Sequence, residues 1–283
     1  MNGQWYSETL YPDFRQTFEV TRVLYDGRSG FQGIVIFENP RFGRVLVLDG
    51  VVQTTERDEF CYHEMITHVP IVAHGAARKV LIIGGGDGGV LREALKHPIE
   101  RAVMVELDDT VVELCREYMP SLSAGAFDDR RTDLRFMDGI KYMAETDEKY
   151  DVIVVDSTDP IGPGEVLFTE KFYRDCGRCL TERGILIAQS GVAFMQTDEA
   201  ASTYKRMRNL FRDATLYVAQ VPTYTAGYMT LGWGSHSPEP RATPVAEIER
   251  RAAKLKLDTR YWNPRVHTAC FALPNYIERL TRS

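Results

Sequence analysis

The hydrophobic pattern divides the chain into two parts. In the first fifty residues, short segments rich in Val, Ile and Phe are separated by turn signals at Asp26-Gly27 and Asn39-Pro40, which predicts antiparallel strands. The predicted strands are Thr17–Tyr25, Gly33–Glu38 and Arg44–Thr54. Asp49-Gly50 is the dipeptide typical of a two-residue hairpin turn. We therefore expect a small antiparallel β domain over residues 1–55.

Beyond this segment, short apolar strands alternate with longer helical stretches. Thr55 and Asp58 resemble a capping box, so a helix is predicted from there to about Val69. The predicted strands are Val80–Ile83, Ala102–Leu107, Leu134–Met137, Asp151–Asp156 and Gly184–Gln189. This alternation indicates an α/β fold with a doubly wound parallel sheet over residues 56–283. Two late segments, Leu216–Val221 and Tyr228–Trp233, are expected to pair antiparallel at the edge of the sheet.

Composition and charge narrow the class of protein. The chain has 283 residues with a net charge of -6, so as a whole it repels nucleic-acid phosphates and anionic lipid. Its apolar runs are much shorter than the ~20 residues of a membrane-spanning helix. It has five cysteines, an odd number, and residues 1–16 lack the features of a secretory signal. We expect a soluble protein of the reducing cytoplasm, with no nucleic-acid or membrane partner.

A glycine-rich loop follows the first strand of the predicted sheet. Gly84, Gly86 and Gly89 satisfy the pattern G-x-G-x-x-G between a strand and a helix. Glu106, twenty residues beyond Gly86, ends the next strand, where a carboxylate can accept both hydroxyls of a ribose. The pattern fits a dinucleotide or an S-adenosyl ligand. Asp87 within the loop would repel a pyrophosphate and attract a cationic amine.

A second group of acids follows a buried strand. The run Asp151–Asp156 places Asp156 and Asp159 at its carboxyl end, where open α/β sheets bind their ligands. Residues 138–165 contain eight acids against two lysines, which a solvated loop or a Mg²⁺ site would also explain. Prolines and glycines after Asp159 would give the loop a defined shape, and an organic polycation is the simpler ligand. A carboxylate there can accept the proton of an amine that attacks a sulfonium.

Together these motifs resemble the polyamine aminopropyltransferase family, which includes the spermidine synthases. The resemblance covers nearly the whole chain and is carried by Leu48–Phe60, Tyr62–Met65, Gly84–Gly89, Asp156–Pro160 and Pro222–Tyr224. It implies a Rossmann-like fold of the S-adenosylmethionine methyltransferase type and a homodimer or homotetramer. It also implies transfer of the aminopropyl group of decarboxylated S-adenosylmethionine to putrescine, which gives spermidine and methylthioadenosine. The donor is a co-substrate, and neither a cofactor nor a metal is implied.

The resemblance assigns roles to individual residues. Asp156 would accept the proton, Asp159 would help to hold the polyamine, Asp87 would bind the aminopropyl amine and Glu106 the ribose. The other implied donor contacts are Gln32, Gly84, Gly86, Asp138, Gly139 and Pro163. The other implied polyamine contacts are Gln53, Tyr62, His63 and Tyr224, with Asp87 shared between both substrates.

Other functions fit parts of the same pattern. A methyltransferase would bind intact S-adenosylmethionine, although Asp87 would repel the α-carboxylate of that donor. A polyamine sensor would keep the acids but would catalyse no reaction. An aminopropyltransferase could also use cadaverine, agmatine or spermidine as acceptor in place of putrescine.

His63 and His68 are five residues apart and diverge on a helix, which disfavours a zinc site. The pair Cys176 and Cys179 falls within a predicted helix and favours a structural interpretation.

Overall fold

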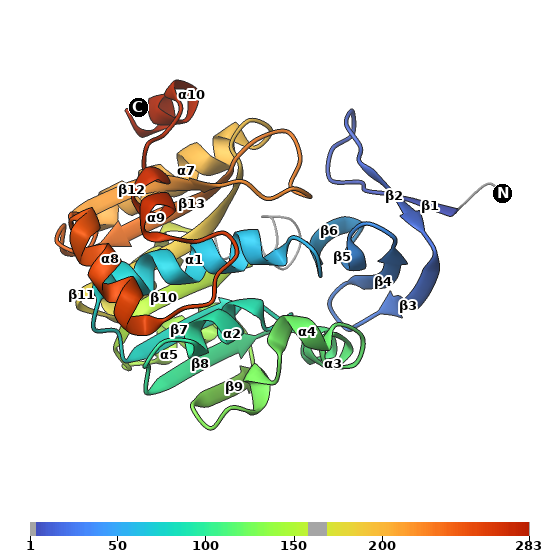
Figure 1. Cartoon of the computed structure of the whole chain (residues 1–283), viewed down its shortest axis with the longest axis horizontal. Helices are drawn as coiled ribbons and strands as arrows, with labels where there is room; N and C mark the ends of the chain where they lie inside the picture. The colour runs from blue at the N-terminus through green and yellow to red at the C-terminus, as the bar shows by residue number, and fades with distance from the viewer. Residues whose placement is uncertain (1–3, 158–168, 283) are drawn as a thin grey trace.

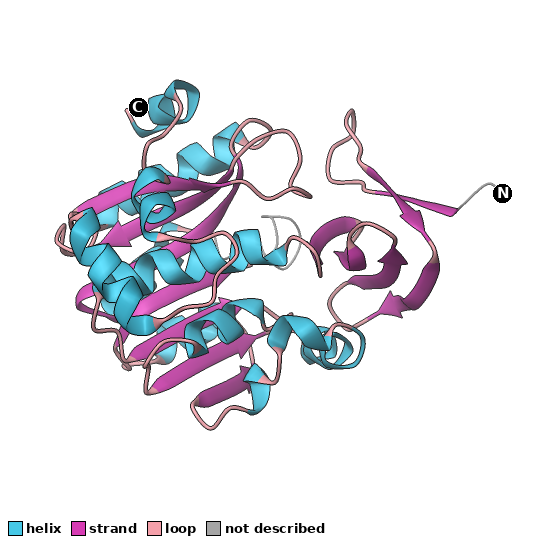
Figure 2. Ribbon diagram, viewed as in Figure 1, coloured by secondary structure: helices cyan, strands magenta, loops and turns pink. Residues whose placement is uncertain are grey.

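The computed structural model describes residues 4–157 and 169–282. A large sheet covered by helices forms one side of the molecule, and the N-terminal strands lie beside it (Figure 1, Figure 2). Within the described residues, seven strands form the large sheet in the order β12-β13-β11-β10-β7-β8-β9. Their bounds are β7 Lys79–Gly84, β8 Arg101–Glu106, β9 Thr132–Phe136, β10 Tyr150–Asp156, β11 Leu180–Val192, β12 Asp213–Ala219 and β13 Met229–Ser235.

The sheet confirms the predicted α/β class. Strands β9, β8, β7, β10 and β11 pair in parallel, and β13 pairs antiparallel with both β11 and β12. In the central register, Val154 of β10 lies opposite Ile82 of β7 and Ile187 of β11. The predicted antiparallel pair at the edge is therefore correct. The parallel strands end together, so residues such as Gly84, Glu106 and Asp156 meet at one edge of the sheet.

Helices cover both faces of the sheet. The described helices are α1 Glu59–His74, α2 Gly89–Leu95, α3 Asp109–Tyr118, α4 Pro120–Ser123, α5 Gly139–Glu145, α6 Glu170–Arg178, α7 Thr197–Leu210, α8 Val245–Leu255, α9 Pro264–Ala269, α10 Asn275–Glu278, and the 3₁₀ turns η1 Ala126–Asp128 and η3 Arg279–Thr281. Side chains of β7 alternate between two cores: Val80 and Ile82 pack with α1 and α2, and Leu81 and Ile83 pack with α5 and α6. Burial on both faces explains why these strands are continuous apolar runs.

The N-terminal strands form two further sheets in the described part of the chain. Strands β3 Arg22–Arg28, β4 Gly33–Asn39, β5 Gly43–Leu48 and β6 Val51–Thr55 make a four-stranded antiparallel sheet, and β1 Gln4–Ser7 pairs with β2 Thr17–Val20. Asp49 and Gly50 connect β5 to β6 with φ of 46° and 87°, which confirms the predicted hairpin. Ile36 and Leu46 pack against Leu114 of α3, so this sheet is anchored to the large one.

Two predictions for the N-terminal strands are wrong. The predicted strand Thr17–Tyr25 divides at Thr21 into β2 and β3, which belong to different sheets. The backbone N–H and the hydroxyl of Thr21 both donate to the carbonyl oxygen of Glu38, which stabilises the bend between them. Asp26-Gly27 lies inside β3 and is not a turn; at Gly27 a Cβ atom would lie 2.7 Å from the Tyr25 hydroxyl, so the glycine makes room for that ring.

The first long helix also differs from its prediction. Its N-cap is Asp58, and Thr55 does not form a capping box, because its hydroxyl donates to the Asp58 side chain at 2.6 Å. The helix continues through Pro70 to His74 and ends at Gly75, which has a φ of 77°. Almost every side chain of α1 is buried, and this packing outweighs the hydrogen bond that proline removes.

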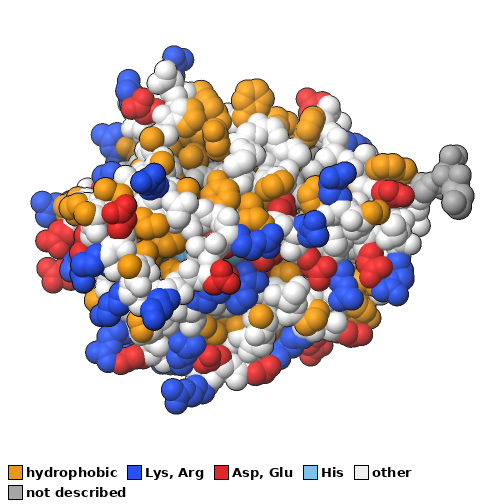
Figure 3. All heavy atoms as spheres, in the orientation of Figure 1, with side chains coloured by type: hydrophobic (Ala, Val, Ile, Leu, Met, Phe, Trp, Pro, Cys, Tyr) orange, Lys and Arg blue, Asp and Glu red, His pale blue; other side chains and the backbone are white. Residues whose placement is uncertain are grey.

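The surface has mixed charge. Figure 3 shows basic and acidic side chains interspersed over the face that it displays, with apolar side chains between them. None of the helices within residues 4–157 and 169–282 has the length and apolarity needed to cross a membrane.

Candidate active site

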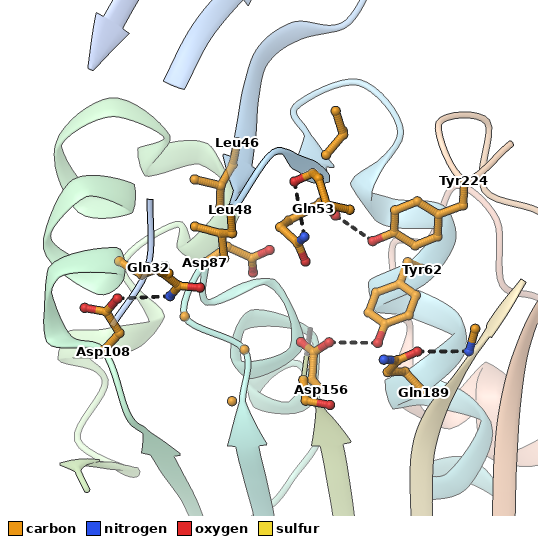
Figure 4. A pocket seen from close by; sticks show the side chains of 18 of the residues that line it. Gln32, Leu46, Leu48, Gln53, Tyr62, Asp87, Asp108, Asp156, Gln189 and Tyr224 are labelled. Atoms are coloured by element: carbon orange, nitrogen blue, oxygen red, sulfur yellow. Dashed lines mark hydrogen bonds between the residues drawn. The ribbon is translucent and has the colours of Figure 1, made fainter. Parts of the chain in front are cut away.

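A cavity of about 200 Å³ lies between the N-terminal sheet and the carboxyl ends of β7, β8 and β10. Figure 4 shows Leu46 and Leu48 of β5 on one side and Asp156 at the end of β10 on the other. The predicted site residues that the structure describes all line this cavity: Gln32, Gln53, Tyr62, His63, Gly84, Gly86, Asp87, Glu106, Asp138, Gly139, Asp156 and Tyr224. Asp159 and Pro163 lie outside the described residues.

The glycine-rich loop brings backbone and side chains unusually close. Gly84 has a φ of 86°, and a Cβ atom there would lie 2.1 Å from the carbonyl oxygen of Asp156. At Gly86 a Cβ atom would lie 3.2 Å from a carboxylate oxygen of Glu106. At Gly89, the first residue of α2, it would lie 2.2 Å from the ring of His63. The glycines thus allow the backbone of Asp156, the carboxylate of Glu106 and the ring of His63 to approach the loop closely.

Asp156 is the last residue of β10, and its side chain lines the cavity. The hydroxyl of Tyr62 donates to its Oδ1 at 2.7 Å, as Figure 4 shows. Burial and the negative charge of Asp87 raise the pKa of Asp156 to about 6, against the opposing effects of His63 and Tyr62. A carboxylate with this pKa is mostly ionised at neutral pH and is a better proton acceptor than an exposed aspartate.

Asp87 has a cationic partner. Its Oδ1 accepts the backbone N–H of Gly89 at 2.7 Å, and its Oδ2 lies 3.3 Å from Nε2 of His63. Burial alone would raise the pKa of Asp87, but the charge and hydrogen bond of His63 outweigh it and the pKa is lowered. Burial likewise disfavours the charged form of His63, yet Asp87 and Glu59 raise its pKa well above the ordinary value. Asp87 and His63 therefore form a buried ion pair.

The side of the cavity next to β8 and α5 contains further acids at strand and helix ends. Glu106 ends β8, and burial raises its pKa to about 7 despite the N–H groups of Leu107 and Asp108, which donate to it. Asp138 is the N-cap of α5 and accepts the N–H of Ile140 at 2.8 Å. Gly139 follows it and also lines the cavity. Hydroxyl or amine donors of a ligand would satisfy these oxygens.

Gln32 reaches the same end from the loop between β3 and β4. Its Nε2 donates to Oδ2 of Asp108 at 2.9 Å (Figure 4). The hydroxyl of Ser29 donates to the same oxygen at 2.6 Å. Asp108 is also the N-cap of α3. Asp108 was not predicted from the sequence, although its position two residues beyond Glu106 and directly before a helix is typical of a residue at the ligand-binding edge of the sheet.

Aromatic side chains line the opposite end. The rings of Tyr62 and Tyr224 meet edge to face with centroids 5.9 Å apart. The Tyr224 hydroxyl donates to the carbonyl oxygen of Gln53 at 2.5 Å, which joins the N-terminal sheet to the loop before β13. Apolar ring faces beside carboxylates suit a ligand that has methylene groups and cationic ends.

Two buried polar residues of this end were missed. Gln189 lies on β11 and Glu8 directly follows β1, and both line the cavity. Gln189 closes a predicted strand, so its place at the carboxyl edge of the sheet was open to prediction. Glu8 accepts the N–H of Val52 and the side-chain amide of Gln16, each at 2.9 Å. No local pattern marks Glu8, because the contacts come from distant segments.

The histidines and cysteines that were set aside have other partners. His68 contacts Glu93 and His97 on the side of α1 away from the cavity. Among the described residues, no three His, Cys, Asp or Glu side chains are grouped as metal ligands.

Cys176 lies in α6 and Cys179 caps it; both are free and buried, and burial raises the pKa of each thiol. A raised thiol pKa is typical of unreactive, structural cysteines.

Comparison with known proteins places this site in a class. The family model described as spermine/spermidine synthase domain matches residues 59–243, and the model described as spermidine synthase tetramerisation domain matches residues 4–56. The chain therefore belongs to the spermine/spermidine synthase family, whose members are aminopropyl-transferring enzymes.

Individual relatives agree with this assignment over nearly the whole chain. The polyamine aminopropyltransferase of Ruegeria sp. (strain TM1040) is 54% identical over 277 residues and covers 98% of each chain. That of Pseudomonas syringae pv. tomato is 54% identical and covers 96% of each. Among solved structures, a spermidine synthase in complex with the transition-state analogue AdoDATO superposes with a TM-score of 0.94 at 38% identity, covering 100% of this chain and 96% of that one. Spermidine synthase from Thermotoga maritima gives a TM-score of 0.93 at 38% identity, covering 100% of this chain and 95% of that one.

Proposed function

We propose that this enzyme transfers the aminopropyl group of decarboxylated S-adenosylmethionine to putrescine, with Asp156 as the proton acceptor. The observation that carries the proposal is the placement of three partly buried carboxylates, Glu106, Asp87 and Asp156, along one cavity. Their partners differ, so the three acids suit three different groups of the substrates. The relatives named polyamine aminopropyltransferase support this class of reaction.

The proposed reaction is a direct displacement at carbon. A neutral amine of putrescine attacks the methylene carbon next to the sulfonium; the new C–N bond forms as the C–S bond breaks, and the electron pair of that bond stays on sulfur. The products are spermidine and methylthioadenosine, and the proton of the attacking nitrogen passes to Asp156. The sulfonium is itself the activated leaving group, so the proposed step uses no further cofactor.

The donor would lie across the ends of β7, β8 and β10. We assign the ribose to Glu106, the adenine edge to Asp138 and Gly139, and the aminopropyl amine to Asp87, with Gln32, Gly84, Gly86 and Pro163 as further donor contacts. The Asp87 charge favours that amine and disfavours the α-carboxylate of intact S-adenosylmethionine, since like charges repel strongly in a buried site.

The diamine would occupy the aromatic end. Tyr62 and Tyr224 flank its methylene groups, and Gln53, His63, Asp87, Asp156 and Asp159 are the proposed polar contacts. The length of this end of the cavity would determine which spacing between two amines fits, and therefore which acceptor is preferred.

We further propose a homo-oligomer in the cytoplasm. The match of residues 4–56 to a spermidine synthase tetramerisation domain supports assembly, as a dimer or a tetramer. The five cysteines, all within the described ranges, are free, which is typical of a reducing compartment.

The direct test is to incubate the purified protein with putrescine and either decarboxylated or intact S-adenosylmethionine, and to analyse the products by mass spectrometry. We expect spermidine and methylthioadenosine from the decarboxylated donor alone. A methylated product from the intact donor would make the protein a methyltransferase. Parallel reactions with cadaverine, agmatine and spermidine rank the acceptors, and absence of any product would contradict the proposal.

A further inference from the structure

Charged side chains continue behind His63, away from the cavity. Nδ1 of His63 lies 2.6 Å from Oε2 of Glu59, one turn earlier on α1. Nη2 of Arg92, on the adjacent helix α2, donates to the same oxygen at 2.7 Å. Nε of Arg92 donates to Glu93 at 2.7 Å. Among the described residues that line the cavity, neither Glu59 nor Arg92 is present, so both act at one remove from any substrate.

The two acids of this chain of charges are buried, and the arginine between them is largely covered. The side chains of Glu59, Arg92 and Glu93 are 9%, 15% and 1% exposed. Arg92 is held at a third point, where its Nη1 donates to the carbonyl oxygen of Leu122 at 2.6 Å. Buried ion pairs contribute little net stability, because desolvation opposes their attraction, but they hold side chains in fixed directions. A positioning role is therefore the stronger explanation of this arrangement.

The ring of His63 is fixed from three sides. Its two nitrogens face Glu59 and Asp87, and its flat side packs on the backbone of Gly89, where any side chain would collide with it. The N–H of Gly89 also donates to Asp87. Helices α1 and α2 pack side by side, so the Glu59–Arg92 contact ties together the two elements that hold the ring (Figure 1).

We propose that Glu59 and Arg92 are positioning residues for aminopropyl transfer: they hold His63 against Asp87 and so orient the carboxylate that receives the donor's amine. The identity of that amine rests on the proposed function. The orientation of Asp87 by Glu59, Arg92 and His63 does not depend on the proposed function.

The charges around His63 make the two residues distinguishable. The charged groups that face it are Glu59 on its own helix, Asp87 in the loop after β7, Arg92 on α2 and Asp156 on β10. Glu59→Gln keeps an oxygen acceptor but removes a negative charge, so the pKa of His63 falls. Arg92→Met removes a positive charge, so the pKa of His63 does not fall, while the carboxylate of Glu59 loses its anchor.

The test is an NMR titration of the histidine rings, with His63→Gln used to identify the resonance. We expect His63 to titrate at a lower pH in Glu59→Gln than in the wild type, and not at a lower pH in Arg92→Met. In both variants the KM for the decarboxylated donor should rise roughly 10-fold, with a smaller change in kcat.

Glu64→Gln is the matched control. Glu64 is a buried acid on the same helix that accepts the backbone N–H groups of Arg260, Tyr261 and Trp262. Its loss should lower the melting temperature without moving the His63 titration. An unchanged titration in Glu59→Gln, or an equal change in Glu64→Gln, would overturn the inference. If the wild type transfers no aminopropyl group, the proposed function fails, but the titration still tests the positioning of His63.

Discussion

The two aspartates at the centre of the cavity, Asp87 and Asp156, have opposite environments. Asp87 lies against the imidazole of His63, which lowers its pKa despite burial. Asp156 has only the hydroxyl of Tyr62 as its close polar contact among the interactions described, and burial raises its pKa to about 6. The comparison separates two tasks: Asp87 stays ionised and suits the binding of a cation, whereas Asp156 is poised to take up a proton.

The difference is produced by neighbours and not by residue type. His63 and Tyr62 are adjacent residues of α1. The same helix therefore supplies a cationic partner to Asp87 and a hydroxyl donor to Asp156. In addition, the charge of Asp87 is itself one cause of the raised pKa of Asp156. A change of Asp87 should therefore also affect Asp156.

The largest effect is expected for Asp156→Asn. The amide keeps the shape of the side chain but cannot accept a proton, so turnover with saturating substrates should fall by roughly 10²-fold or more. Spermidine formation measured by mass spectrometry reports the rate. Binding of methylthioadenosine serves as the control for intact folding. Near-normal turnover would remove Asp156 from the role of proton acceptor.

Asp87→Asn should chiefly affect donor binding. Loss of the charge that faces the donor's amine should raise the KM for decarboxylated S-adenosylmethionine by about 10- to 100-fold. It should also reduce the preference over the intact donor. Methylthioadenosine has no aminopropyl group, so its affinity, measured by calorimetry, should not change. An equal loss of affinity for both ligands would argue against a contact between Asp87 and the amine.

The two asparagine variants should change stability in opposite directions at pH 8. The raised pKa of Asp156 means that its contribution to stability is lost as pH rises from about 4 to about 6, so Asp156→Asn should melt higher than the wild type. The pKa of Asp87 is lower in the folded than in the unfolded protein, so its ionised form stabilises the fold at pH values above its unfolded pKa. Asp87→Asn should therefore melt lower than the wild type. Each change is of order 1 kcal/mol, or about 2 to 4 °C. Shifts of the same sign in calorimetric scans would contradict the comparison.

The smallest effect concerns Tyr62. Activity should rise with pH through about 6 as Asp156 ionises. The Tyr62 hydrogen bond lowers the pKa of Asp156, so Tyr62→Phe should move this limb of the profile of kcat/KM upward by about 0.5 pH unit. Tyr224→Phe is the matched control, since the Tyr224 hydroxyl donates to Gln53. A limb that moves equally in both variants, or downward in Tyr62→Phe, would refute this explanation.

Local sequence patterns predicted most of the large sheet. The apolar runs that became β7, β8 and β10 are buried on both faces, so their hydrophobicity is continuous and their ends carry recognisable residues. The N-terminal strands were predicted less well, because contacts between distant segments decide them. Thr21 bends the chain through its bonds to Glu38, and Gly27 accommodates Tyr25 inside a strand.

The candidate site shows the same division. Asp156, Glu106 and Asp87 stand at positions where a strand end or a glycine loop alone indicates ligand binding. Gln32, Gln53 and Tyr224 were selected only through the family resemblance, since nothing in their local sequence distinguishes them. Glu8 and Asp108 were not selected, yet they line the same cavity.

By itself, the sequence determined the alternation of strands and helices in the large sheet, the hairpin turn at Asp49-Gly50 and the acids at the strand ends, because these depend on short-range periodicity and backbone conformation. Only the tertiary structure decided that Asp87 has a cationic partner and that Asp156 has a hydroxyl donor instead. A pKa depends on burial and on charges from other elements, and His63, Glu59 and Arg92 reach Asp87 only after α1 and α2 have packed together. Division of the chemistry between Asp87 and Asp156 is thus a property of the folded protein.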